Sequence, residues 1–223
     1  MVATPLLIAH RAGNDPAQLR AAEAVGADVI EADLHLWCGR LELRHLKTAG
    51  PLLYWDRWAL APPWRRFDLL DDLLAIAAPE TVLMLDLKGR DRAAARMLSA
   101  ALARAQRSAP VIVSARAWPL LDEIDPARAQ RIGSAARPRQ LDGLIAHATA
   151  RPLDGASLHL RLLERDRLDA LREHAPLLMT WPVNRRGEAE RATALGVTGL
   201  ISDELALLGE LRGERALRGP AGA

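Results

Sequence analysis

The chain has few of the features that cross-link a protein, anchor it in a membrane or give it a strong charge. Its single cysteine, Cys38, excludes an internal disulfide and is typical of a protein in a reducing compartment. No apolar run is long enough to span a bilayer. The N-terminus lacks the basic segment and the cleavage site of a signal peptide, so we expect a cytoplasmic protein.

An excess of one charge is also absent. The 223 residues include 30 Lys and Arg against 28 Asp and Glu, which gives a net charge of +2. The basic residues are spread along the chain and form no tail, so the pI of 9.2 is weak support for nucleic-acid binding, and we predict no nucleic-acid partner. The length suits one domain with a sizeable core. The sequence does not indicate an oligomeric state.

Lysine and asparagine are scarce, whereas Arg, Ala and Leu are abundant. The two lysines are Lys47 and Lys88, and the two asparagines are Asn14 and Asn184. Lysine presents a compact point charge that the planar fork of arginine does not reproduce. We therefore expect some of these retained side chains to do what the common residues cannot.

Short apolar runs alternate with longer segments rich in Ala, Leu and Arg to the end of the chain. This alternation predicts a parallel α/β sheet, and eight repeats favour closure into a TIM (β/α)8 barrel. The alternative is an open doubly wound sheet, but 12–16 is a poor match to the Gly-rich turn that usually opens one. The predicted strands span 6–10, 28–35, 82–87, 111–114, 130–133, 156–160, 177–181 and 199–202. The predicted helices span 16–26, 67–77, 91–107, 117–124, 137–148, 164–174, 186–195 and 203–212, with one barrel domain over 1–212 and a disordered tail over 213–223.

Polar side chains follow four of the apolar runs directly. Because the C-terminal ends of parallel strands meet at one face of a barrel, we expect these side chains to converge on one mouth. Two imidazoles, three carboxylates, an Arg and a Lys favour metal-assisted cleavage of a phosphodiester, with His as acid and base. The set comprises His10 and Arg11 after 6–9, Glu31 and Asp33 after 28–30, His45 after 41–44, and Asp86 and Lys88 after 82–85.

Three carboxylates at one site would repel one another unless a cation lies among them. Glu31 and Asp33 are two residues apart, so both point to the same side of their strand, and Asp86 ends the next one. A Mg²⁺ or Ca²⁺ ion would remove the repulsion, since both prefer oxygen ligands. A salt-bridge cluster with Lys88 and Arg11 would explain the same residues, and spacing alone does not choose between the two.

Histidine supplies the candidates for proton transfer. An unperturbed imidazole titrates near neutral pH, and His10 and His45 both end predicted strands beside the carboxylates. His35 lies two residues after Asp33 on the same side and is a candidate extra ligand, although we favour a structural role for it.

The segment 46–66 is irregular and rich in aromatic residues. In a barrel it would lie over the face that carries the polar side chains. We interpret it as a loop that its aromatic residues hold onto the barrel; the alternative is a lid that contacts an amphipathic substrate or a membrane surface. Its aromatic residues are Tyr54, Trp55, Trp58 and Trp64, with Arg57, Arg65 and Arg66 among them.

Six short motifs occur in order along nearly the whole chain. They are His10-Arg11-Ala12, the run from Ala24 to Leu34, His45, Asp86-Leu87-Lys88, Trp181-Pro182-Val183-Asn184, and the run from Gly196 to Asp203. None is specific alone, but the ordered set resembles the glycerophosphodiester phosphodiesterase family.

This resemblance implies a TIM barrel of the phospholipase C-like phosphodiesterase type, acting in lipid and glycerol metabolism. Such enzymes cleave a glycerophosphodiester to glycerol phosphate and an alcohol. A lysophospholipid is a related substrate, and its cleavage gives acylated glycerol phosphate and an alcohol. The resemblance also implies a role for each residue. It makes Glu31, Asp33 and Asp86 the ligands of Ca²⁺ or Mg²⁺, His10 and His45 the general acid and base, Arg11 and Lys88 the neutralising charges, and Trp181 and Asn184 the pocket lining.

The chain also departs from the family pattern. Members usually carry Pro-Glu-Asn-Thr after the first motif, where this chain has 16–19 with Gln18 in the Asn position, and Asp86 stands in place of Glu. Loss of supporting residues often lowers metal affinity or activity by about 10- to 100-fold. Two alternatives therefore stay open: a barrel that binds a phosphorylated ligand without turnover, and a lysophospholipase D-like enzyme related to toxins that form cyclic phosphates.

Overall fold

Eight parallel strands form a closed barrel in the computed structural model, which describes residues 4–49, 53–56, 59–62, 64–105 and 107–217. The barrel closes because the first strand pairs with the last on one side and with the second on the other. The predicted TIM barrel is confirmed. Its strands are β1 (Leu6–Ala9), β2 (Val29–Trp37), β7 (Val82–Leu87), β8 (Val111–Ala115), β9 (Ala129–Ala135), β10 (Gly155–His159), β11 (Leu177–Trp181) and β12 (Gly199–Ser202).

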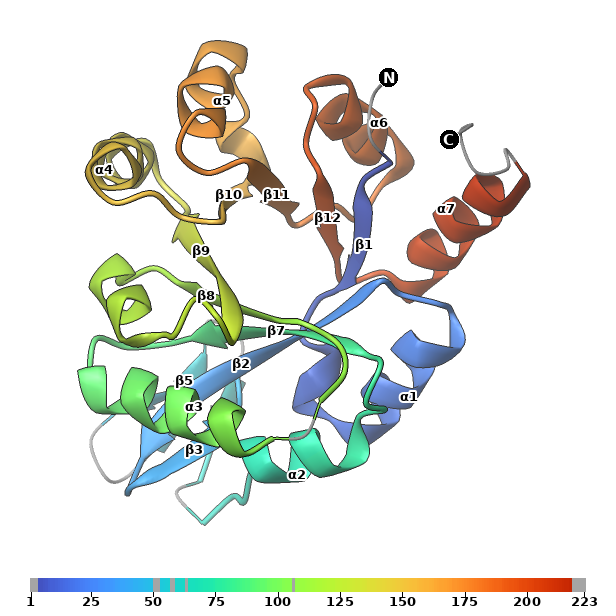
Figure 1. The fold of residues 1–223 in the computed structure, drawn as a ribbon. Coiled ribbons are helices and arrows are strands. Elements are labelled where there is room, and N and C mark those ends of the chain that lie inside the picture. The colour runs from blue at the N-terminus through green and yellow to red at the C-terminus, as the bar shows by residue number, and fades with distance from the viewer. Residues whose placement is uncertain (1–3, 50–52, 57–58, 63, 106, 218–223) are drawn as a thin grey trace.

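Helices surround the strands, as Figure 1 shows. Amphipathic spacing of Ala and Leu buries one face of each helix against the sheet; α3 buries five such residues. The α-helices are α1 (Pro16–Ala24), α2 (Leu70–Ile76), α3 (Arg92–Arg104), α4 (Pro138–Ala150), α5 (Arg165–Arg172), α6 (Arg186–Ala194) and α7 (Leu205–Leu217). Short 3₁₀ helices are η1 (Ala12–Asn14), η2 (Trp118–Glu123) and η3 (Leu160–Leu162).

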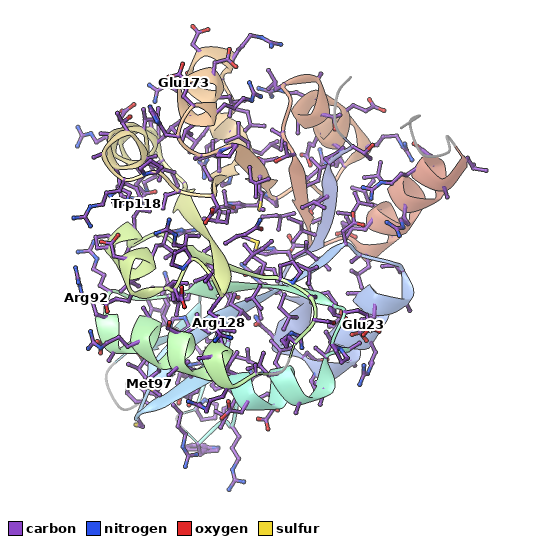
Figure 2. The ribbon with its side chains drawn as sticks, viewed as in Figure 1. Glu23, Arg92, Met97, Trp118, Arg128 and Glu173 are labelled. Atoms are coloured by element: carbon purple, nitrogen blue, oxygen red, sulfur yellow. The ribbon has the colours of Figure 1, made fainter. Side chains whose placement is uncertain are left out.

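The helix predicted over 117–124 is the 3₁₀ helix η2. Pro119 lies in its first turn and Pro126 follows its end, and the residue before a proline avoids the α conformation, so there is room for only a short helix. Trp118, labelled in Figure 2, fixes η2 on the barrel, because its indole N–H donates to the carbonyl oxygen of Ser134 at 3.1 Å.

The last helix continues past its predicted end at residue 212. Arg212 and Arg215 place guanidinium nitrogens 2.7 and 2.9 Å from the carboxylate oxygens of Asp28, which ties the C-terminal turns of α7 to the start of β2. These contacts outweigh the low helix propensity of Gly213. Residues 213–217 are therefore helical rather than disordered, and the remaining six residues of the predicted tail lie outside the described part of the chain.

Apolar side chains fill the barrel interior below the mouth. The two-residue period of the strands directs alternate residues inward, and a separate buried cluster lies there, distinct from the larger core between strands and helices. This plug leaves only the C-terminal ends of the strands for polar residues. Its buried members are Ile8, Val29, Met84, Ile112, Ile132, Met179 and Ile201.

The segment 46–66, predicted to be irregular, holds a small antiparallel sheet between β2 and α2. It follows a hairpin in which β3 (Arg40–Leu43) pairs with the end of β2 through a turn with positive φ at Cys38 and Gly39. Its strands are β4 (Lys47–Ala49), β5 (Leu53–Asp56) and β6 (Ala59–Ala61), too short for an alternating pattern to show in the sequence. Two of its aromatic and basic residues, Arg57 and Trp58, lie outside the described residues.

The buried aromatic residue of this small sheet is Tyr54, which is 5% exposed. Its ring meets Phe67 edge-on at 5.0 Å, and the Arg44 guanidinium lies 5.0 Å from it. By contrast, Trp55 and Trp64 are 40% and 79% exposed. The aromatic residues therefore divide into an anchor and an exposed set.

None of the described helices is both long and apolar enough to cross a membrane.

Candidate active site

A cavity opens at the C-terminal ends of the strands, and most of the predicted site residues line it. They come from separate elements: β1 supplies one histidine, β2 and β7 supply the acids, and the second histidine follows β3. The topology thus brings together predicted residues that are up to 171 positions apart in the sequence, from His10 to Trp181. The lining includes His10, Arg11, Glu31, His45, Met84, Asp86, Lys88, Ser114, Arg116, Ser134, Ser157, Trp181 and Ile201.

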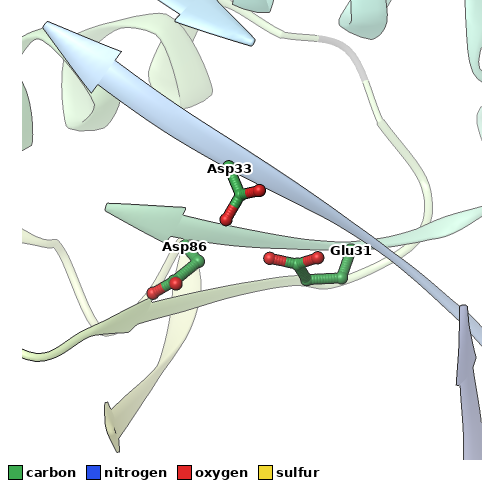
Figure 3. A group of neighbouring side chains, drawn as sticks. All are labelled: Glu31, Asp33 and Asp86. Carbon is green, nitrogen blue, oxygen red and sulfur yellow. The ribbon is translucent and has the colours of Figure 1, made fainter. Parts of the chain in front are cut away.

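Three carboxyl groups point toward one another at this mouth, as Figure 3 shows. Glu31 and Asp33 are inward-facing neighbours on β2, and Asp33 is the register partner of Asp86 on β7. One oxygen from each of the three lies within 4.8 Å of the others. Glu31 and Asp33 are 3% and 0% exposed, so water screens their charges little.

Lys88 bridges two of these acids. Its Nζ lies 2.5 Å from Asp33 Oδ1 and also contacts Asp86. Burial alone would lower the pKa of Lys88, but the charges of the three carboxylates outweigh that effect and raise it. Lys88 therefore stays charged within the cluster. It lowers the pKa of Asp33 although burial acts in the opposite direction.

Burial and a neighbouring charge favour the protonated form of Glu31. Burial first, and then the charge of Asp33, raise the pKa of Glu31 to about 7, while His10 and Lys88 only partly oppose that rise. Three carboxylate oxygens that lie this close together are donors that a hard divalent cation prefers. The residues present therefore fit Mg²⁺ or Ca²⁺, and two of the three carboxylates also contact Lys88.

His10 belongs to a hydrogen-bonded chain that the sequence did not reveal. Its Nδ1 lies 2.7 Å from Asp203 Oδ1. The other oxygen of Asp203 accepts from the Asn184 amide at 3.1 Å, and Asn184 Oδ1 accepts from the Asp203 backbone N–H at 3.0 Å. Asp203 thus fixes the ring orientation of His10, and Asn184 fixes Asp203.

The same contacts set the charge preference of His10. Burial acts to lower its pKa, but the hydrogen bond to Asp203 and the charges of Glu31 and Asp203 outweigh burial and raise it. The hydrogen bond to His10 in turn lowers the pKa of Asp203 to about 2. The remaining ring nitrogen, Nε2, lies 4.0 Å from Glu31 Oε2.

Arg11 ties the second histidine to the carboxylates. Its Nη2 lies 2.8 Å from His45 Nε2, and because arginine only donates, that nitrogen of His45 is the acceptor and carries no proton. The backbone N–H of Arg11 donates to Glu31 Oε2 at 2.6 Å. Arg11 adopts φ of 57°, which is uncommon for a residue with a side chain and is typical of functional sites.

Both asparagines and one of the two lysines of the chain lie at this site. Asn14 donates to Asp33 Oδ2 at 3.0 Å and accepts from the Asp33 backbone N–H at 2.8 Å. Asn184 holds Asp203, and Lys88 joins the acids, whereas Lys47 lies in the small sheet 5.1 Å from the Trp55 ring. Scarcity was thus the available signal for Asn14, because no motif marked it.

Other predicted residues lie elsewhere than expected. Asn184 is not among the described cavity-lining residues; it acts behind Asp203. Gln18 is exposed in the first turn of α1, so Asn14 rather than Gln18 supports the acids. Burial, Arg44 and Lys88 lower the pKa of His35 to about 3, which leaves it neutral, and it does not join the carboxylate group.

The comparison with known proteins agrees with this architecture. No protein-family model and no curated protein matches the sequence. Among solved structures, a glycerophosphodiester phosphodiesterase from Thermotoga maritima matches with a TM-score of 0.75 and 15% identity, over 94% of this chain and 99% of that one. The chain has the fold of these enzymes.

Two further structures support the same statement. A phosphodiesterase from Oleispira antarctica in complex with the product sn-glycerol-3-phosphate matches with a TM-score of 0.75 and 15% identity, over 94% of this chain and 97% of that one. A glycerophosphodiester phosphodiesterase from Parabacteroides distasonis matches with a TM-score of 0.72 and 18% identity, over 97% of this chain and 100% of that one. The motif resemblance is therefore matched by the fold across nearly the whole chain.

Proposed function

We propose that the chain is a metal-dependent phosphoric diester hydrolase that cleaves glycerophosphodiesters to glycerol phosphate and an alcohol. The observation that carries the proposal is the meeting of two histidines and three carboxylates at the C-terminal mouth of this barrel. A neighbour of the same fold in complex with sn-glycerol-3-phosphate supports the substrate class.

The residues of the chain divide the chemistry among them. His10 and His45 line the cavity from different elements, so one can take a proton from the attacking oxygen while the other gives a proton to the leaving oxygen. Asp203 holds His10 through Nδ1, and Arg11 holds His45 through Nε2. Arg11 and Lys88 offset the negative charge that moves onto the phosphoryl oxygens in the transition state.

Glu31, Asp33 and Asp86 would hold the divalent cation. A bound cation polarises a phosphoryl oxygen and lowers the pKa of a hydroxyl or water beside it. Neighbouring side chains orient two of these carboxylates by hydrogen bonds. Asn14 donates to Asp33, and the Ser114 hydroxyl donates to Asp86 Oδ1 at 2.8 Å. That second contact fixes an aspartate whose side chain is one methylene shorter than the usual glutamate.

The proposal is tested by incubating the purified protein with glycerophosphoglycerol and glycerophosphocholine in Ca²⁺, in Mg²⁺ and in EDTA. We expect release of glycerol phosphate with a divalent cation and none with EDTA. Absence of turnover from folded protein that binds glycerol phosphate would contradict the proposal and favour the alternative of a barrel that only binds a phosphorylated ligand.

A second candidate substrate is a lysophospholipid presented at an anionic membrane surface. The segment 46–66, which holds the small sheet, carries four of the five large apolar side chains that are exposed among the described residues: Leu53, Trp55, Leu60 and Trp64. Three basic residues of the same segment, Lys47, Arg65 and Arg66, are also exposed. Apolar side chains with basic neighbours suit anionic lipid headgroups.

We expect the protein to sediment with phosphatidylglycerol vesicles, and Leu60→Ser with Trp64→Ser to weaken that binding by about tenfold or more, because each side chain loses the free energy of burial in lipid. Leu217→Ser is the matched control, since Leu217 is an exposed leucine at the end of α7. Equal binding by all three proteins, or no binding by the wild type, would contradict the membrane contact.

A further inference from the structure

Next to the carboxylates, the segments that follow β8 and β10 carry positive charge that has no negative partner among the described residues. Arg116 follows β8 and Arg161 lies in η3 after β10, and both are exposed. Within the part of the chain that the structure describes, no carboxylate oxygen lies within 4.0 Å of either guanidinium, although most other arginines of the helices form such ion pairs. These two charges are therefore available to a ligand.

Trp181 and His159 connect the two arginines through a series of side-chain contacts. The Arg116 guanidinium lies 5.2 Å from the centre of the Trp181 ring, and Arg116 and Trp181 both line the cavity. The His159 ring meets Trp181 edge-on at 4.9 Å, and Arg161 Nε lies 3.3 Å from His159 Nδ1. Burial, and then the charges of Arg161 and Arg116, lower the pKa of His159, which agrees with an excess of positive charge here.

The position of Arg116 decides which headgroups this side can accept. An open Trp face beside a phosphodiester site would attract a quaternary ammonium such as choline. Here the Arg116 guanidinium already lies over that face, and a cationic headgroup would meet two like charges. An anionic group would instead accept charge-assisted hydrogen bonds from the planar forks of both arginines.

We propose that Arg116 and Arg161, held by Trp181 and His159, form a headgroup subsite for glycerophosphodiesters whose alcohol part carries a second anionic group, a phosphate, phosphodiester or carboxylate. This inference rests on the proposed phosphodiesterase activity and adds the substrate class. The scissile phosphate lies on the β1, β2 and β7 side with the carboxylates and histidines, and the second anion lies on the β8, β10 and β11 side.

The test compares kcat/KM for three substrates: bis(glycerophospho)glycerol, whose headgroup carries a second phosphodiester, neutral-headed glycerophosphoglycerol, and glycerophosphocholine. We expect the wild type to prefer the anionic substrate over the choline one. In Arg116→Gln that preference should fall by about 10-fold or more, the usual effect of losing a hydrogen bond to a charged group. In Arg116→Glu it should turn toward glycerophosphocholine.

Arg128→Gln is the matched control, because Arg128 is an exposed arginine that precedes β9 at the opposite end of the barrel and is labelled in Figure 2. Its substrate preference should equal that of the wild type. Cleavage of all three substrates without preference, or an unchanged preference in Arg116→Gln, would overturn the subsite and leave the phosphodiesterase proposal standing. No cleavage of any substrate would overturn both.

Discussion

Replacing His10 with alanine is expected to lower kcat by about 10²- to 10⁴-fold, the usual contribution of a positioned general acid or base. His10 lies at the end of β1 in the cavity, and its Nδ1 is engaged by Asp203, which leaves Nε2 for a reacting group. The side chain is small and at the mouth rather than in the apolar plug, so the fold should persist. Steady-state kinetics and a thermal unfolding curve measure the two quantities.

His174→Ala serves as the control for this substitution, because the side chain of His174 is 30% exposed and lies on the loop between α5 and β11, away from the cavity. Its kcat should equal that of the wild type. A His10→Ala protein that is folded and fully active would contradict the assignment of His10 as an acid or base.

Asp203→Asn separates the positioning of His10 from its chemistry. The amide keeps the size of the side chain but no longer accepts through two charged oxygens, so the ring is less well oriented. Misplacement of a reacting group can cost about 100-fold, and we expect a loss of that order in kcat with little change in KM. A structural role alone would instead lower the melting temperature and leave kcat per folded molecule unchanged.

The sequence predicted the barrel because its signals are local and repeated. Most strands of the barrel are short apolar runs. On β7 the alternate residues Met84 and Asp86 both face the barrel interior, at different heights. The ends of the barrel strands therefore mark the mouth and place His10 and the three acids there. His45 follows β3, which pairs antiparallel with the end of β2, so it reaches the cavity through that hairpin. Buried parallel strands are the elements for which pattern and environment agree most closely.

The residues that the sequence did not identify act through contacts between distant elements. Asp203 reaches His10 across 193 positions, and Arg116, which follows β8, meets Trp181 at the end of β11. No spacing rule connects such pairs, because their proximity depends on closure of the barrel. The sequence did not predict the small sheet within 46–66 for another reason. Its strands have three or four residues, which is too short for a hydrophobic period to show.

Removal of the proposed divalent cation is expected to lower kcat as much as the His10→Ala substitution does, and to lower the melting temperature as well. Three buried or half-buried carboxylates face one another, and one oxygen of each lies within 4.8 Å of the others. A cation at 100 times its Kd stabilises the folded state by about 2.7 kcal/mol. For a chain of this length that free energy corresponds to an increase in Tm of about 5–10 °C. Titration of Ca²⁺ and Mg²⁺ into EDTA-treated protein, followed by thermal unfolding and calorimetry, measures it.

Asp86→Asn tests the same site through one ligand. Asparagine keeps the shape and the contact with Ser114 but removes a charged ligand, so we expect at least about a 100-fold loss of cation affinity, beyond the effect of losing a supporting residue. Asp71→Asn, an exposed aspartate in the first turn of α2, is the control and should keep the affinity of the wild type.

The alternative of a structural salt-bridge network predicts the opposite pattern for these proteins. If Lys88 alone completed the cluster, neither cation would raise the Tm of the wild type. Asp86→Asn would then lower the stability of the fold, because Lys88 would lose one of its two carboxylate partners, without changing any response to metal. A rise in Tm with Ca²⁺ or Mg²⁺ that Asp86→Asn abolishes and Asp71→Asn retains is thus the result that only a metal site produces.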